Sequence, residues 1–72
     1  MNLEQQKKQA RELLQAIRAG QADALAHLRD RHLRWASVDD PTLRGEVALH
    51  DAQFVVAREQ GFASWTKLKA YA

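Results

Sequence analysis

The 72-residue sequence contains no cysteine, one proline and three glycines. Without cysteine, it can form neither the disulfide framework nor the thiolate zinc site that stabilises many very small domains. Its longest apolar runs span only a few residues, far below the length of a membrane span, and its N-terminus is polar rather than signal-like. These absences favour a cytoplasmic chain that has no membrane partner and depends on its own core.

An excess of charge of either sign is also missing. Eleven basic and nine acidic residues leave a formal charge of +2, which gives no strong attraction to polyphosphate. Basic residues cluster once, where Arg29, Arg31, His32 and Arg34 lie within six positions, although Asp30 interrupts them and can pair with Arg34. We favour a solvated helix face here over a nucleic-acid contact.

Constellations that carry chemistry are absent as well. No hydroxyl lies in a glycine-flanked elbow or a lysine-containing phosphate loop. His27 and His32 are five apart, whereas a shared metal on a helix usually takes a spacing of three or four, so His32 is expected to lie half-buried beside Trp35. The sequence therefore predicts no enzyme activity, no metal, no cofactor and no small-molecule substrate.

What the chain does contain is helical periodicity in its first half. An apolar stripe that includes Leu3, Leu14 and Ile17 predicts a helix over residues 3–19, capped by Asn2, stopped by Gly20 and supported by a Glu4–Lys8 pair. A second helix is expected over 22–34. Residues 36–46, with Asp-Asp-Pro and a later glycine, are interpreted as a loop whose Val38 and Leu43 tuck against the core.

The second half has a local structural role for almost every residue and predicts helices over 51–60 and 64–72. His50 is taken as the N-cap of the first, with Gln53 reaching back to it and a hydrophobic staple beside it. Gly61 is the expected helix stop and Ser64 the cap of the last helix. The residues assigned structural roles are Trp35, Leu49, Phe54, Ala57, Gly61, Phe62 and Ser64.

Together these patterns predict an all-α fold: a single domain over 1–72, built as a compact bundle of about four short helices, with the last two in a helix-turn-helix-like arrangement. A chain of this size buries only about 60% of the surface that its unfolded form exposes. Its stability margin is therefore expected to be thin.

Two blocks are similar to a known family. They are residues 3–14 with Ala19-Gly20, and residues 51–69, in which the run Ala-Arg-Glu-x-Gly-Phe-x-Ser-Trp is the most specific part. They resemble the small N-terminal helical module that precedes ankyrin repeats in bacterial proteins, and a looser version occurs beside glyoxalase-like domains. The resemblance implies an accessory or interaction role without catalytic residues.

Three features depart from that family. Gln21-Ala22-Asp23 replaces the commoner Asp-Pro-Glu helix start, Thr66 stands where proline is frequent, and no ankyrin repeat follows within the sequence. The chain is expected to be either a stand-alone small protein or a piece of a longer one.

The favoured functional hypothesis is a non-catalytic protein-interaction or accessory module that contacts a protein partner, an adjacent domain or a second copy of itself. Additional burial would help a core this small. The expected partner-binding residues are Leu3, Leu14, Ile17, Trp65 and Leu68, although the same residues could simply fill the internal core.

The alternative is a DNA-binding protein that reads duplex DNA with the 64–72 helix. Thr66, Lys67 and Lys69 would be its exposed polar groups. Lysines can contact phosphates, but the helix lacks the arginine, asparagine and glutamine side chains that best discriminate bases.

Overall fold

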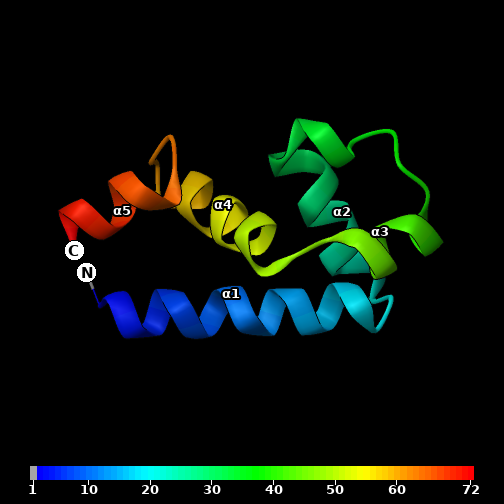
Figure 1. Ribbon diagram of the computed structural model, residues 1–72, viewed down its shortest axis with the longest axis horizontal. Coiled ribbons are helices and arrows are strands. Elements are labelled where there is room, and N and C mark those ends of the chain that lie inside the picture. Colours follow the sequence, from blue (N-terminus) through cyan, green and yellow to red (C-terminus); the bar gives the residue numbers. More distant parts are fainter. Residues whose placement is uncertain (1) are drawn as a thin grey trace.

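The computed structural model describes residues 2–72, and within that range all regular secondary structure is helical (Figure 1). The all-α class is therefore confirmed, with one helix more than the four expected. The elements are α1 (Leu3–Arg18), α2 (Ala22–Arg31), the 3₁₀ turn η1 (Leu33–Trp35), α3 (Asp40–Glu46), α4 (Leu49–Glu59) and α5 (Trp65–Tyr71).

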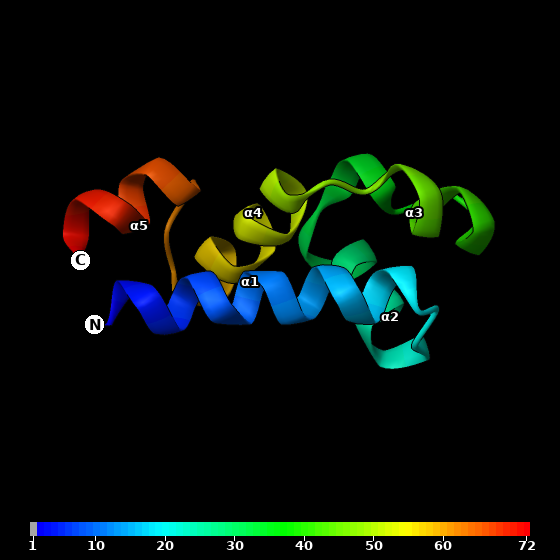
Figure 2. The ribbon, with the colours of Figure 1, turned by 60° about the horizontal axis from the view of Figure 1, so that its bottom comes forward.

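Helix α1 forms one side of the elongated molecule, and the shorter helices lie across it. Figures 1 and 2 show α4 and α5 over its first half and α2 and α3 over its second half, with both chain ends at the same end of the molecule. Helix α1 contacts α2, α3 and α4, while α5 packs mainly on α4. No helix among residues 2–72 combines the length and the apolar character needed to cross a membrane.

The core is one connected cluster of apolar side chains that draws on α1, α2, η1, α3 and α4. Ile17 and Leu28 are completely buried in it, and Leu68 of α5 is equally inaccessible. The side chain of Trp35, the last residue of η1, is also buried. The buried members of the cluster are Ala10, Leu14, Ile17, Ala24, Leu25, Leu28, Trp35, Leu43, Val47, Ala52, Val55 and Val56.

The prediction of a loop over residues 36–46 is wrong, because α3 occupies Asp40–Glu46. Asp39 caps this helix by accepting a hydrogen bond of 3.0 Å from the backbone N–H of Thr42, and Pro41 falls in the first turn, where proline fits. The Asp-Asp-Pro run was thus a helix start rather than a turn. Leu43 is fully buried and Val38 packs against the core, as expected.

The start of α4 also differs from the expectation. The helix begins at Leu49 with Ala48 at the N-cap, so Asp51 instead of Gln53 occupies the third position and accepts a hydrogen bond of 3.0 Å from the Ala48 N–H. Alanine has no side-chain acceptor, so only this half of a capping box forms. Leu49 is 39% exposed and does not act as the staple residue.

Most of the other helix ends agree with the local signals. Gly20 and Gly61 have positive φ, and at Gly61 the Schellman pair of hydrogen bonds, Gly61 N–H to Arg58 and Phe62 N–H to Ala57, closes α4. Ser64 accepts from the Lys67 N–H, and Asn2 caps α1. Among the charged pairs of α1, Glu4 contacts Lys7 rather than Lys8, which instead approaches Glu12.

Candidate functional site

The end of α2 creates the most distinctive surface of the molecule. The helix stops at Arg31, three residues earlier than expected, and His32 adopts an extended conformation before η1 begins. Backbone bonds of 3.0 and 3.1 Å from Trp35 and Ala36 to His32 and Leu33 close the 3₁₀ turn. Residues two apart on such a turn point in different directions, so burial of Trp35 places Leu33 outward.

Leu33 is 88% exposed, the highest value among the large apolar side chains that are exposed. Arg34 directly follows it and Arg31 stands two positions before it, and both arginines are on the surface. The guanidinium of Arg34 lies 4.9 Å from the ring centroid of Trp35, within cation–π range. An exposed apolar side chain and a cation held against an aromatic ring are therefore consecutive residues of one turn.

A buried carboxylate anchors this turn to α4. Asp51 is only 2% exposed, and its Oδ1 lies 3.0 Å from Nε2 of His32, which is itself largely buried. The ring of His32 packs against Phe54 at 4.6 Å and meets Trp35 edge-on at 6.5 Å. The expectation that His32 lies half-buried beside Trp35 is confirmed, and the contact with Asp51 ties the residue after α2 to the start of α4.

The electrostatics of Asp51 reflect its donors. Burial by itself raises the pKa of Asp51, but the hydrogen bond from Ala48, the nearby indole N–H of Trp35, and His50 and His32 together hold this pKa below its ordinary value. Although that indole N–H is near Asp51, it is buried without a hydrogen bond of normal geometry among residues 2–72. Asp51 is therefore a structural anion at neutral pH.

His50 completes the corner from the α4 side. Its Nε2 lies 3.6 Å from Oδ1 of Asp51, the atom that His32 also contacts, while its own side chain is largely in solvent. Because both histidines converge on one oxygen, the start of α4 and the turn η1 form a common corner. We call Arg31, Leu33, Arg34 and His50 the corner surface.

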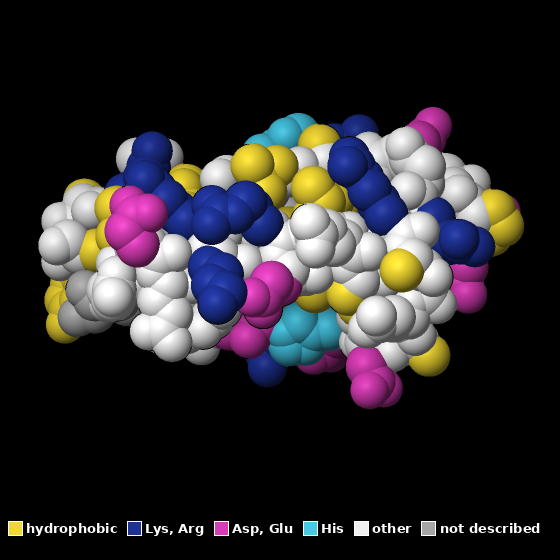
Figure 3. All heavy atoms as spheres, turned by 90° about the horizontal axis from the view of Figure 1, so that it is seen from below, with side chains coloured by type: hydrophobic (Ala, Val, Ile, Leu, Met, Phe, Trp, Pro, Cys, Tyr) yellow, Lys and Arg dark blue, Asp and Glu magenta, His cyan; other side chains and the backbone are white. Residues whose placement is uncertain are grey.

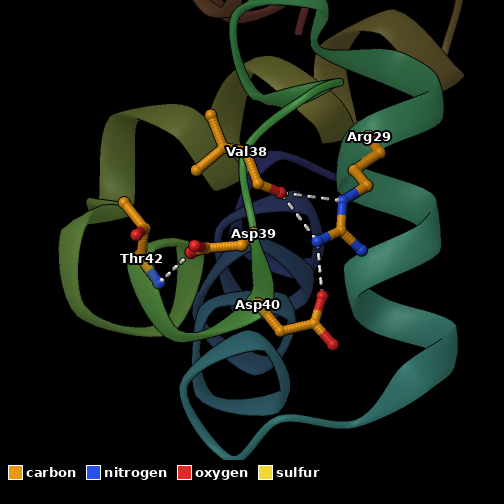
Figure 4. A network of polar contacts seen from close by, with 5 residues as sticks. All are labelled: Arg29, Val38, Asp39, Asp40 and Thr42. Atoms are coloured by element: carbon orange, nitrogen blue, oxygen red, sulfur yellow. Dashed lines mark hydrogen bonds and ion pairs between the residues drawn. The ribbon is translucent and has the colours of Figure 1, made fainter.

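The segment that follows η1 is fixed by Arg29 (Figure 4). Its guanidinium donates to the carbonyl of Val38, at 2.8 Å from Nη2 and 3.3 Å from Nε, and also pairs with Asp40. Hydrogen bonding by Thr42, with a smaller contribution from Arg29, lowers the pKa of Asp39 despite some desolvation. Arg29 therefore holds the chain between η1 and α3 instead of facing a ligand.

Three of the expected partner-binding residues do not lie on the surface. Ile17 and Leu68 are completely buried and Leu14 is 9% exposed, so these three fill the core, which was the other interpretation of the same pattern. Leu3 is partly buried, and Trp65 is partly buried against the core. The prediction that Leu14, Ile17 and Leu68 form a partner-binding face on α1 and α5 is therefore wrong.

The outer face of α1 carries mixed charge instead. Figure 3 looks onto this helix and shows lysine and arginine side chains interspersed with acidic ones, with hydrophobic side chains only in small groups. A shallow hollow of about 500 Å³ along α1 is lined entirely by polar residues: Asn2, Glu4, Gln5, Lys8, Gln9 and Glu12. It has none of the hydrophobic and aromatic side chains that line most small-molecule sites.

Residues with expected structural roles are mostly in place. Phe54 packs on His32, Ala57 is fully buried, and the ring of Phe62 lies 5.2 Å from that of Tyr71. His27 and His32 contact different carboxylates: His27 contacts Glu59, near the end of α4, and His32 contacts Asp51, near its start. Across residues 2–72, no three histidine or acidic side chains are grouped so that they could hold a metal ion.

Sequence reasoning missed Leu33 and the role of Asp51. The basic cluster around residue 33 was noted, but Leu33 within it was not, because a helix running to residue 34 was assumed. The available signal was that Leu33 falls outside the apolar stripe formed by Leu25, Leu28, His32 and Trp35.

Comparison with known proteins identified no relatives. No family model, no curated protein and no solved structure matches this chain. The resemblance to the module that precedes ankyrin repeats therefore stays a prediction from the residues alone.

Proposed function

We propose that this chain is a non-catalytic protein-interaction module and that the corner surface is where its partner binds. The observation that carries the proposal is the 88% exposure of Leu33 on an ordered turn. Burying a leucine side chain contributes about 1.5–3 kcal/mol, and this contribution is left unused in the isolated chain. A partner that covers Leu33 would recover it.

The way the turn is held supports the proposal. Trp35, two residues after Leu33, is buried, and His32, directly before it, contacts Asp51. Arg29 binds the carbonyl of Val38 in the segment that follows the turn. A turn whose backbone is already held loses little backbone entropy on binding, so more of the free energy gained from contacts with Leu33 is retained. The corner surface has the character of a preformed contact site.

Photo-crosslinking tests this proposal. The chain has no cysteine, so Ala36→Cys, at the exposed end of η1, can carry a single benzophenone label while Leu33 stays in place, with Ala26→Cys on the exposed side of α2 as the matched control. In an extract of the producing cell, we expect a discrete protein adduct from position 36 and none from position 26, and the adduct should be lost when Leu33→Ala is added. An adduct of twice the chain's mass would identify a second copy as the partner. Equal labelling from both positions, or none from position 36, would contradict the proposal.

DNA binding through the last two helices remains the alternative hypothesis. Helices α4 and α5 meet across the Gly61 turn, and α5 exposes Thr66, Lys67 and Lys69. However, α5 has only seven residues. Fluorescence anisotropy with duplex DNA separates the two ideas: salt-dependent binding that is lost in Lys67→Ala and Lys69→Ala would favour the DNA-binding alternative.

A further inference from the structure

We propose that the corner surface selects an acidic protein segment carrying an apolar side chain, with Leu33 covering the apolar group and Arg34 pairing with a neighbouring carboxylate. This inference rests on the proposed interaction function and adds the chemistry of the partner. It follows from which charges the corner exposes and which it buries.

The cation beside Leu33 is held in place. The guanidinium of Arg34 lies 4.9 Å from the ring centroid of Trp35, a side chain that is itself buried. Arginine is suited to pairing with a carboxylate through two parallel N–H donors, and stacking on an aromatic ring limits its conformational freedom before binding. Arg34 can therefore meet a carboxylate at a fixed place relative to Leu33.

The carboxylate of Asp51, beneath the corner surface, is buried. The side chain of Asp51 is only 3% exposed and is engaged by the Ala48 N–H, His32 and His50. By contrast, the side chains of Arg31 and His50 are 48% and 73% exposed. An approaching ligand therefore meets the side chains of Arg31 and His50 before it meets the buried carboxylate.

The exposed carboxylate of Asp30 contacts this surface. Asp30 approaches Arg31 at 3.6 Å, which offsets part of the charge of that arginine. Arg34 has no such carboxylate among its recorded contacts across residues 2–72, and its described contact is the ring of Trp35. Arg34 is therefore the principal charged contact that we assign.

An acidic protein segment fits this surface better than a nucleic acid. An exposed leucine such as Leu33 gains from an apolar partner and gains nothing from a phosphate backbone. The chain's formal charge is only +2, so the long-range attraction to a polyanion is weak. A segment with acidic residues on both sides of an apolar one satisfies Leu33 and the arginines together.

Peptide selection followed by binding measurements tests the inference. Random peptides displayed on phage are selected on the intact chain, and selected peptides are then synthesised and titrated by fluorescence anisotropy. We expect enrichment of aspartate and glutamate around an apolar residue. Leu33→Ala should weaken binding by about tenfold or more, and Arg34→Gln should weaken it and reduce its dependence on salt. Arg18→Gln, which removes an exposed arginine of α1, should leave affinity unchanged.

The outcomes separate this inference from the proposed function. Peptides that need Leu33 but carry no acidic bias would overturn the inference and leave the interaction function standing. If the peptides bind the Leu33→Ala variant with the same affinity as the unaltered chain, and circular dichroism shows that the variant is folded, both the inference and the proposed interaction function are overturned. Duplex DNA that binds with an affinity dependent on Arg34 would overturn the choice of a protein ligand.

Discussion

Leu68→Ala is expected to lower the free energy of unfolding by about 2–5 kcal/mol, the range for removing a large buried side chain. A chain of this length has a total stability of roughly 4–11 kcal/mol, so the variant would lose a large part of it. The reason lies in α5, which has seven residues and only one buried side chain, Leu68. So short a helix is unstable by itself and depends on its packing against α4.

Urea denaturation followed by far-ultraviolet circular dichroism measures this loss. Lys69→Ala is the matched control, because Lys69 lies on the same helix and is exposed; its effect should stay within about 0.5 kcal/mol. A Leu68→Ala midpoint no lower than that of Lys69→Ala would contradict the placement of Leu68 in the core.

Asp51→Ala is expected to cost about 2–3 kcal/mol at neutral pH, because it removes a charged acceptor and leaves the Ala48 N–H and His32 without their partner. Asp51→Asn should cost less, since an amide oxygen can still accept from Ala48. Thermal unfolding of both variants beside the unaltered chain measures the difference.

The pH dependence of this effect has a definite sign. The pKa of Asp51 is lower in the folded chain than in the unfolded one, so its ionisation stabilises the fold above the unfolded pKa of about 3.9. That contribution is lost as the pH falls through the lower, folded value. The pKa of Asp39 is also lowered by folding, but Asp39 is present in all three proteins. Its contribution to the pH dependence of stability therefore cancels when the proteins are compared.

We therefore expect the stability gap between the unaltered chain and Asp51→Asn to be constant near neutral pH and to narrow as the solution is acidified below about pH 4. Melting temperatures measured down to about pH 2.5 check this. A gap that does not change over the range would show that the carboxylate is not held as an anion by the fold.

The elements with local signals were predictable from the sequence. Gly61 stops α4 because glycine adopts positive φ without strain, and Ser64 caps α5 because its hydroxyl reaches a free N–H. These interactions involve residues a few positions apart, so sequence spacing is enough to identify them. The all-α class followed from such signals and from the periodicity of α1.

The elements that tertiary contacts decide were not predictable in the same way. Asp51 can serve equally well at the first or the third position of a helix, and its contact with His32, nineteen positions earlier, agrees with the third. The early end of α2 was not predictable from local signals either, because no glycine or proline marks it. It is accompanied by tertiary contacts, since Trp35 of the following 3₁₀ turn is buried in the core.

The candidate site was the hardest part to predict. An amphipathic stripe shows which residues of α1 are apolar but not whether they face the core or a partner, and the packing of α2, α3 and α4 on α1 buries Leu14 and Ile17. The sequence shows that Leu33 falls outside the apolar stripe of α2, but its place on a turn that protrudes from the helix follows only from where α2 ends. A 3₁₀ turn has fewer residues per turn than an α-helix, so a side chain assigned to a face of an α-helix points elsewhere when its residue belongs to a 3₁₀ turn.

The most direct test of this account is the reactivity of single thiols at positions 33 and 68. Because the chain has no cysteine, Leu33→Cys and Leu68→Cys each report one site with a chromogenic disulfide reagent. The account predicts that the thiol at 33 reacts about as fast in the folded chain as in urea, while the thiol at 68 reacts only when the chain unfolds. Protection of position 33, or ready reaction of position 68 in a folded chain, would contradict it.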